Sequence, residues 1–190
     1  MLTINFTPFP VLETERLVLR QLEPADQQDL FVLRSSPALM QFIPRPLAKS
    51  ATDAASLIED FRMSAIANER ITWGITEKTA STVIGTIGYV RILKEHARAE
   101  LGYLLHADHQ GKGLMLEAVR AVIDYGFRVM NLHAIEAIID PENTASGRVL
   151  ERSGFRKEGH LRDNIWFNGQ FRDSVIYARL VTDTSLAGPP

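Results

Sequence analysis

The chain has no cysteine among its 190 residues. It can therefore form no disulfide framework, no thiol nucleophile and no cysteine-based metal site. It also lacks an apolar run of about 18 residues, the length that a membrane-spanning helix needs. The first ten residues, MLTINFTPFP, have no basic region of the kind found in signal peptides and contain two prolines. From these absences we expect a soluble, cytoplasmic protein without a membrane partner.

An excess of basic charge is also missing. The formal net charge is −2, and the basic clusters are short and interrupted. Nucleic-acid binding depends on clustered Lys and Arg that neutralise phosphates, so we expect no nucleic-acid partner. What the chain does have is 45% hydrophobic residues, enough for a substantial core. We expect one domain over residues 1–181 and a flexible tail over residues 182–190, which are small, polar and proline-ended.

The most informative stretch runs from Arg98 to Met130. Glu100–Leu105 is a short, mostly apolar run typical of a buried strand. From Leu114 onward, apolar residues recur at three- and four-residue steps, which predicts a helix with one buried face. The intervening loop, His109–Gly113, has two glycines and no proline, so all its amides can donate hydrogen bonds. A helix that begins directly after such a loop is an anion site, best suited to a phosphate group.

Two common phosphate loops do not fit this stretch. A Walker A loop ending at Gly111-Lys112 requires Gly at position 106 and Ser or Thr at position 113, where the chain has His106 and Gly113. A dinucleotide fingerprint starting at Gly111 requires a third glycine at position 116, which is Leu116. The phosphate-bearing ligand therefore belongs to another class.

The remaining elements surround this stretch. The predicted strands are Glu15–Leu22, Ile71–Thr76, Val83–Ile92, His133–Asp140 and a terminal hairpin of Phe155–Phe167 and Gln170–Leu180 around Asn168-Gly169. The predicted helices begin at Pro24, after Ser50 and near Asn143, with the last ending at Ser153-Gly154, and Leu39–Lys49 is predicted to be a loop. This order predicts an α/β (α+β) fold, a mixed sheet with helices on both faces.

The glycine loop resembles the coenzyme A loop of the GCN5-related N-acetyltransferases, the GNAT superfamily. That family's pattern is Gln or Arg, two residues, Gly, one residue, then Gly or Ala. Gln110, Gly113 and Met115 occupy the three positions, and Met115 departs from the pattern. Three further blocks look like the RimJ/RimL branch, which acetylates N-terminal amines of ribosomal proteins. These blocks are Glu13–Arg20, Asn143–Ser146 with Gly154-Phe155, and Asn168–Asp173 with Tyr177-Ala178.

The resemblance implies a GNAT fold, with a mixed central sheet of about seven strands and a splayed central strand pair. It also implies that the chain binds acetyl-CoA through a set of residues in and after the central strand. The implied set is Leu104, Leu105, His109, Gln110, Gly111, Lys112, Gly113, Leu114, Met115, Asn143 and Ser146. Met115 is bulky where the family has a small residue, but the backbone donors survive that change. For Asn143, the alternative is a helix N-cap or turn residue.

Transfer of acetyl from a thioester to an amine needs a neutral nucleophile, a donor for the carbonyl oxygen and a proton for the leaving thiolate. The resemblance makes Glu100 the candidate base, although this residue fits an exposed carboxylate at a strand end equally well. It makes the Leu104 backbone N–H the oxyanion donor and places Ser146 near the sulfur. Many relatives have a protonating tyrosine seven residues after the asparagine, where this chain has Leu150. Tyr103, Ser146 or water then has to protonate the leaving thiolate, unless no acid is needed.

No metal site is expected, because the five histidines have no carboxylate cluster beside them. His106 and His109 are expected to line the loop near the coenzyme. Phe42–Arg45, Trp73 and Trp166 are candidates for the wall of the acceptor site, although aromatic residues in strands are more often core residues.

Three functions fit these features. The first is an acetyl-CoA-dependent N-acetyltransferase that acts on the N-terminal α-amine of a protein or peptide by direct attack on the thioester. The second is an acetyltransferase for a small amine such as an antibiotic, a polyamine or an amino acid. The third is a non-catalytic module that binds acyl-CoA. The resemblance allows a monomer or a homodimer.

Overall fold

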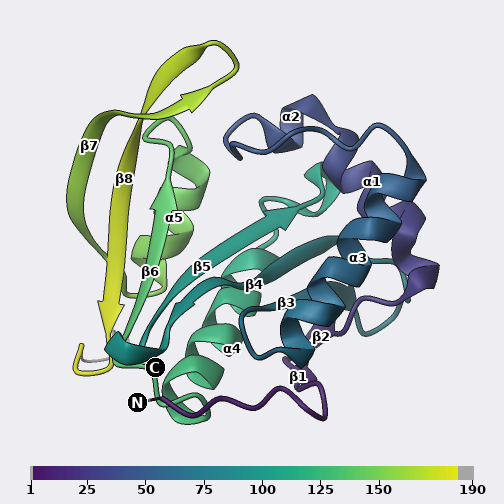
Figure 1. The fold of residues 1–190 in the computed structure, drawn as a ribbon, viewed down its shortest axis with the longest axis horizontal. Helices are drawn as coiled ribbons and strands as arrows, with labels where there is room; N and C mark the ends of the chain where they lie inside the picture. The colour runs from purple at the N-terminus through teal and green to yellow at the C-terminus, as the bar shows by residue number, and fades with distance from the viewer. Residues whose placement is uncertain (1, 184–190) are drawn as a thin grey trace.

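A computed structural model describes residues 2–183 and contains an eight-stranded sheet with helices on both faces (Figure 1). The strands are β1 (Leu12–Glu13), β2 (Leu17–Arg20), β3 (Ile71–Glu77), β4 (Gly85–Leu93), β5 (Arg98–Leu105), β6 (Ala134–Ile139), β7 (Arg156–Phe167) and β8 (Gln170–Leu180). The helices are α1 (Gln27–Ser35), α2 (Pro37–Met40), α3 (Ala51–Ile66), α4 (Leu114–Arg128) and α5 (Thr144–Arg152). Three 3₁₀ turns join them: η1 (Pro24–Asp26), η2 (Lys94–His96) and η3 (Ala107–His109). Within residues 2–183, no helix has the length and apolar character to span a bilayer.

The strand order is β1-β2-β3-β4-β5-β6-β8-β7, and β5–β6 is the parallel pair among antiparallel neighbours. This pair is hydrogen-bonded only over Arg98–Glu100 and Ala134–Glu136, although the strands continue to Leu105 and Ile139. Beyond Glu100 the two strands therefore separate, and the expected splayed central pair is confirmed. The separation leaves one edge of β5 without a strand partner where the chain approaches the glycine loop.

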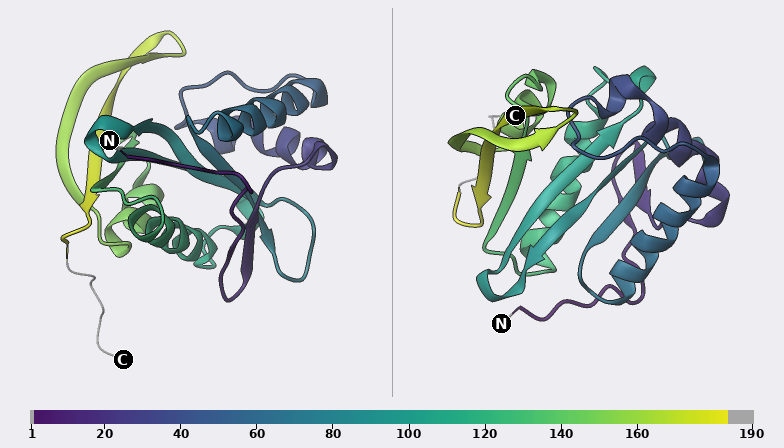
Figure 2. Two further views of the ribbon diagram at one scale, coloured as in Figure 1. Left: turned by 60° about the horizontal axis from the view of Figure 1, so that its bottom comes forward. Right: turned by 45° about the horizontal axis from the view of Figure 1, so that its top comes forward.

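Helices cover the two faces of the sheet separately (Figures 1 and 2). Helix α4 buries Ala118, Val119 and Val122 against one face, in a core cluster that includes Leu101 and Leu105 of β5. Helices α1 and α3 pack on the other face around a smaller cluster to which β5 contributes Leu104. Because successive side chains of a strand point to opposite faces, odd-numbered residues of β5 face α4 and even-numbered residues face α1 and α3.

Local signals place the helix ends where the sequence predicts them. Ser50 caps α3 by accepting the Asp53 N–H at 3.3 Å, while the Asp53 carboxylate accepts the Ser50 N–H at 3.2 Å. This reciprocal arrangement satisfies two donors that a helix terminus leaves unpaired. Helix α4 begins at Leu114, directly after Gly113 in a left-handed conformation.

Three predictions differ from the structure. The sheet has eight strands instead of about seven, because the two-residue β1 pairs with β2 at the edge. Trp73 is fully buried, with its indole N–H donating to the Pro10 carbonyl at 2.7 Å, so it belongs to the core and not to a substrate wall. Thr182 and Asp183, predicted to be part of the flexible tail, form a turn in which Asp183 accepts the Leu180 N–H. The rest of the predicted tail, residues 184–190, lies outside the described residues.

Candidate functional site

A cleft of about 1530 Å³ opens where β5 and β6 separate. Its walls come from the glycine loop, the first turn of α5, the segment that follows α2, and the β7–β8 hairpin. Two of these walls meet at Arg172 of β8, which donates to the Gln41 carbonyl at 3.1 Å and pairs with Asp140 at 3.3 Å. The predicted acceptor wall Phe42–Arg45 lines the cleft. Trp166 does not line it and is 62% exposed beside Phe171.

The glycine loop presents a run of unused backbone donors. The N–H groups of the six residues from Gly111 to Leu116 have no hydrogen-bond partner within residues 2–183. Gly111 and Gly113 adopt φ values of +73° and +78°, a left-handed conformation that favours glycine. Nothing lies within 4 Å of the position that a Cβ would take at Gly111. Consecutive free amides at a helix N-terminus fit a phosphate group, so the residues present suit the pyrophosphate of coenzyme A.

The loop is held in place from the other end of the sequence. Glu117, in the first turn of α4, accepts the Arg16 N–H at 2.8 Å and the Thr14 hydroxyl at 2.5 Å, and pairs with the Arg16 guanidinium at 2.6 Å. The same guanidinium donates to the Lys112 carbonyl at 3.0 Å. Burial works to raise the pKa of Glu117, but the hydrogen bonds from Thr14 and Arg16 outweigh it and lower the pKa. Sequence reasoning missed this contact, because about 100 residues separate its two sides.

Several residues predicted to bind the cofactor have structural partners of their own. The Gln110 side chain donates to the Leu105 carbonyl at 3.0 Å, and this hydrogen bond links the end of β5 to the glycine loop. His109 lines the cleft and pairs with Glu77 of β3 at 2.8 Å, and Lys112 is exposed outside the cleft lining. Met115 lines the cleft and is 7% exposed. Leu114 is also buried at the start of α4 and lines the cleft.

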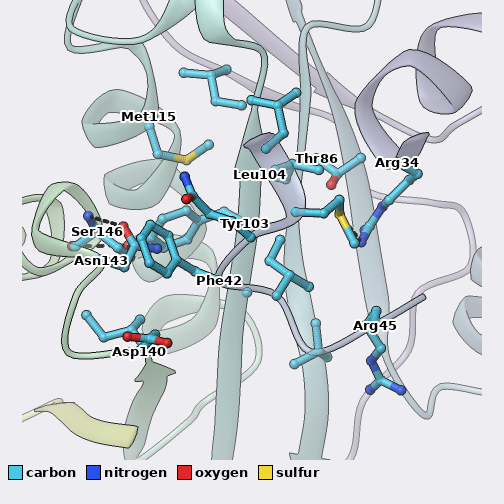
Figure 3. A pocket seen from close by; sticks show the side chains of 18 of the residues that line it. Arg34, Phe42, Arg45, Thr86, Tyr103, Leu104, Met115, Asp140, Asn143 and Ser146 are labelled. Atoms are coloured by element: carbon cyan, nitrogen blue, oxygen red, sulfur yellow. Dashed lines mark hydrogen bonds between the residues drawn. The ribbon is translucent and has the colours of Figure 1, made fainter. Parts of the chain in front are cut away.

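Tyr103 and Ser146 lie together at the side of the cleft formed by α5 (Figure 3). Their hydroxyl oxygens are 2.6 Å apart. Asn143 caps α5 by accepting the Ser146 N–H at 3.1 Å, so the alternative role foreseen for Asn143 is observed. Burial raises the pKa of Tyr103 to about 12, and its hydrogen bond to Ser146 lowers the pKa by less. Leu150, at the position where relatives have a tyrosine, is fully buried in the core.

The register of β4 and β5 decides which backbone N–H faces the gap between β5 and β6. His106 donates its N–H to the Ile84 carbonyl at 2.8 Å, and hydrogen-bonded pairs alternate along an antiparallel ladder. The next such pair is Leu104 with Thr86, which stand opposite each other. The Leu104 N–H, predicted to be the oxyanion donor, is therefore directed into the ladder with β4. The Tyr103 N–H points the other way, into the gap.

Glu100 lies on the other face of β5 from Tyr103. It lines the cleft with its side chain 23% exposed, and its carboxylate pairs with Arg91 of β4 at 3.0 Å. Tyr103 follows Glu100 by three residues along the strand, or about 10 Å at the usual rise. A base at Glu100 would therefore reach an amine near the Tyr103 hydroxyl through water.

The described residues contain no group of three or more His, Cys, Asp or Glu side chains arranged as a metal site. A cradle of free amides, a gap between two parallel strands and a hydroxyl pair beside that gap define a class of protein. They are the parts of a transferase that holds a nucleotide-linked acyl thioester and presents its carbonyl to a second substrate.

Comparison with known proteins identifies the family. Residues 16–156 match the acetyltransferase (GNAT) domain, and the chain belongs to this family. It is 35% identical to YoaA of Bacillus subtilis, an uncharacterized N-acetyltransferase, over 90% of this chain and 96% of that protein. It is 37% identical to the [ribosomal protein uS5]-alanine N-acetyltransferase of Escherichia coli over 58% of each chain. It is also 36% identical to the Escherichia coli spermidine N(1)-acetyltransferase over 48% of this chain and 49% of the other.

Solved structures support the same assignment. The ribosomal-protein-S5-alanine acetyltransferase of Vibrio fischeri superposes with a TM-score of 0.82 at 26% identity, covering 92% of this chain and 98% of the other. A GNAT-family acetyltransferase from Bacillus anthracis gives a TM-score of 0.80 at 27% identity, covering 90% and 98%. The protein is therefore an N-acetyltransferase that uses acetyl-CoA, and enzymes of the predicted RimJ/RimL type are among its relatives.

Proposed function

We propose that the enzyme acetylates the N-terminal α-amine of a protein or peptide by direct attack on the thioester of acetyl-CoA. The observation that carries this proposal is the cleft, whose volume of about 1530 Å³ exceeds the roughly 300–1,000 Å³ typical of a pocket for one small ligand. It extends from the amide cradle to the segment after α2 and the β7–β8 hairpin. A pantetheine arm and an extended peptide end fit such a shape together. Similarity to the uS5-alanine enzyme supports the same acceptor.

In this proposal, residues in different parts of the cleft bind the coenzyme, stabilise the carbonyl oxygen and the leaving sulfur, and accept the proton of the amine. The free amides from Gly111 to Leu116 hold the pyrophosphate, and the Tyr103 N–H donates to the carbonyl oxygen in the gap. The hydroxyl pair of Tyr103 and Ser146 faces the leaving sulfur. Glu100, on the opposite face, receives the proton of the amine through water. Glu100 and the hydroxyl pair then lie on opposite faces of β5, so the amine can lose its proton on one face while hydrogen bonds stabilise the leaving thiolate on the other.

A polyamine acceptor is the rival suggested by the spermidine enzyme. The cleft lining includes the arginines Arg34 and Arg45, and neither forms an ion pair within residues 2–183. A polycationic acceptor would be repelled by these charges. The proposal therefore ranks an α-amine above spermidine.

The test is release of CoA from acetyl-CoA with three acceptors: a short peptide with a free N-terminus, the same peptide with a blocked N-terminus and one lysine, and spermidine. We expect the free N-terminus to give the highest kcat/KM. A preference for spermidine would overturn the acceptor assignment. Ser146→Ala is the matched variant, and it should lower kcat while CoA binding measured by calorimetry stays the same. Tight CoA binding without release for any amine would favour the non-catalytic module.

A further inference from the structure

Arg34 is a half-buried cation without a carboxylate partner in the part of the chain that the structure describes. It follows Leu30 by four residues on α1, which places it beside the stripe that packs on the sheet. Its Nε is buried and has no hydrogen-bond partner in the described part of the chain. Its Nη1 approaches only the Met40 sulfur, at 4.0 Å, and a thioether is a weak acceptor. Burial lowers the pKa of Arg34, and the charge of Arg45 lowers it further.

Some of the other arginines of the cleft are neutralised. Arg70 pairs with Asp60 at 2.5 Å and Arg172 with Asp140 at 3.3 Å, whereas Arg148 and Arg152 of α5 line the opposite, α5 side of the cleft and form no ion pair within the described residues. Arg34 and Arg45 line the same cleft, and no carboxylate within residues 2–183 forms an ion pair with either. A buried charge is strongly unfavourable unless it is paired. The Nε–H of Arg34 is buried without a partner, and the exposed Arg45 adds a second cation to the same cleft, so the two together point to an anion that binds there.

The position of the two arginines indicates that they bind the acceptor and not the coenzyme. Figure 3 shows Arg34 and Arg45 across the cleft from Ser146. Met40, which Arg34 contacts, belongs to the core cluster on the α1 and α3 side of the sheet, together with Leu104. The free amides that suit the pyrophosphate stand at the N-terminus of α4, which packs on the opposite face. Glu100, the candidate base, faces the same side as Arg34.

We propose that Arg34 and Arg45 form an anion subsite at the acceptor end of the cleft, and that the preferred acceptor is an amine that also carries a carboxylate. This inference rests on the proposed function, because it assigns the subsite to the acceptor of that reaction. The carboxylate has two possible sources: an acidic side chain next to a peptide N-terminus, or the α-carboxylate of a free amino acid. A guanidinium binds either through paired N–H···O hydrogen bonds.

Matched acceptors test the substrate side. The amidated tripeptides Ser-Glu-Ala and Ser-Gln-Ala differ by one side-chain carboxylate, and glycine and glycinamide differ by the α-carboxylate. We expect the wild-type enzyme to favour the acidic member of one pair in kcat/KM. Arg34→Met should reduce that preference by about tenfold to about 150-fold, the contribution of one hydrogen bond to a charged group, and leave the KM for acetyl-CoA unchanged. Arg34→Lys should recover only part of the preference, because lysine lacks the planar fork.

The control is Arg62→Met, on the exposed surface of α3, where Arg62 pairs with Glu59. This variant should keep the wild-type preference. The subsite is refuted if the wild type shows no preference within either pair, or if Arg34→Met changes the KM for acetyl-CoA instead. In the first outcome the acceptors are still acetylated, so the proposed function survives the loss of the subsite.

A binding measurement covers the opposite case, in which the anion subsite exists but the proposed acetylation does not occur. With CoA saturating, glutarate, a dicarboxylate without an amine, should raise the unfolding temperature of the wild type but not that of Arg34→Met, and glutaramide should do neither. Stabilisation by glutarate without acetylation of any amine would support the anion subsite and reject the proposed reaction. Equal stabilisation of wild type and Arg34→Met by glutarate, or none of either, would reject the subsite. Arg34→Met removes a half-buried charge, so we expect this variant to fold.

Discussion

Tyr103→Phe should slow the chemical step without removing an ionisable acid. The phenol of Tyr103 has a pKa of about 12 because the side chain is buried. An ordinary thiol has a pKa near 8.5, roughly 3.5 pH units lower. Complete transfer of the Tyr103 proton to the leaving thiolate would therefore be unfavourable by about 5 kcal/mol. We expect Tyr103 to stabilise the thiolate as a hydrogen-bond donor that keeps its proton.

The size of the effect follows from that role. A hydrogen bond to a charged group is worth about 1.5–3 kcal/mol, so Tyr103→Phe should lower kcat about tenfold to about 150-fold. The variant also removes the 2.6 Å partner of the Ser146 hydroxyl. The two effects are therefore coupled, and Tyr103→Phe with Ser146→Ala should lower kcat by less than the product of the single changes.

The assay is kcat for CoA release between pH 6 and 9.5 in wild type, both single variants and the double variant. Because Tyr103 stays protonated up to about pH 12, its removal should lower kcat by the same factor at every pH in this range. The pKa of Tyr103 is raised above its ordinary value of 10.0, so its contribution to stability is complete below pH 10 and is lost toward pH 12. An alkaline decline in the wild type that disappears in Tyr103→Phe would refute the reasoning, and so would an unchanged kcat.

Four further predictions concern the rest of the site. Glu117→Gln should weaken the contact with Thr14 and Arg16 and raise the Kd for CoA about fivefold, the difference of about 1 kcal/mol between charged and neutral hydrogen bonds; calorimetry measures this, and Glu59→Gln on the surface of α3 should leave the Kd unchanged. Since the pKa of Glu117 is lowered, its stabilising contribution is complete above about pH 4.5 and should be lost at lower pH, so Glu117→Gln should flatten the acid branch of the stability curve. Glu100→Gln should slow acetylation of a lysine amine more than that of an α-amine, because about one α-amine in ten but fewer than about one lysine in a thousand is neutral at pH 7; equal rates for mutant and wild type on both acceptors from pH 6 to 9 would make Glu100 structural. Exhaustive chelation should leave the rate of CoA release unchanged, and a loss of activity that zinc restores would contradict this.

The sequence predicts what is decided locally. The buried strand before the glycine loop, the helix after it and the terminal hairpin follow from apolar spacing, glycines and caps within a few residues. Structure and prediction agree on these elements to within a few residues. The splayed strand pair was not visible in any local pattern and was predicted from the family resemblance alone.

Contacts between distant segments carry no local signal. The hydrogen bonds from Thr14 and Arg16 to Glu117 join the turn between β1 and β2 to the first turn of α4. In the sequence, Glu117 is an ordinary acidic residue near a helix start, where acidic residues are favoured in any case. Arg34 is a different case. It follows Leu30 by four positions, where the buried face of an amphipathic helix normally carries an apolar residue. Such a departure is the kind of signal from which a buried functional charge can be predicted.

The backbone donor in the gap shows why one residue of register matters for mechanism. In a strand, successive N–H groups point to opposite neighbours, so the donor is either Tyr103 or Leu104 and never both. The hydrogen bond from His106 to Ile84 fixes this parity, and it depends on how β4 is aligned with β5. A shift by one residue would exchange the two faces of β5, but both faces carry apolar side chains, Leu101 and Leu105 on one and Leu104 on the other, so the β5 sequence alone does not specify the alignment. With the Tyr103 N–H in the gap, the proposed backbone donor to the carbonyl oxygen and the phenol that we propose faces the leaving sulfur belong to one residue. Any substitution at position 103 that shifts the strand would therefore disturb both functions together, whereas Tyr103→Phe isolates the phenol.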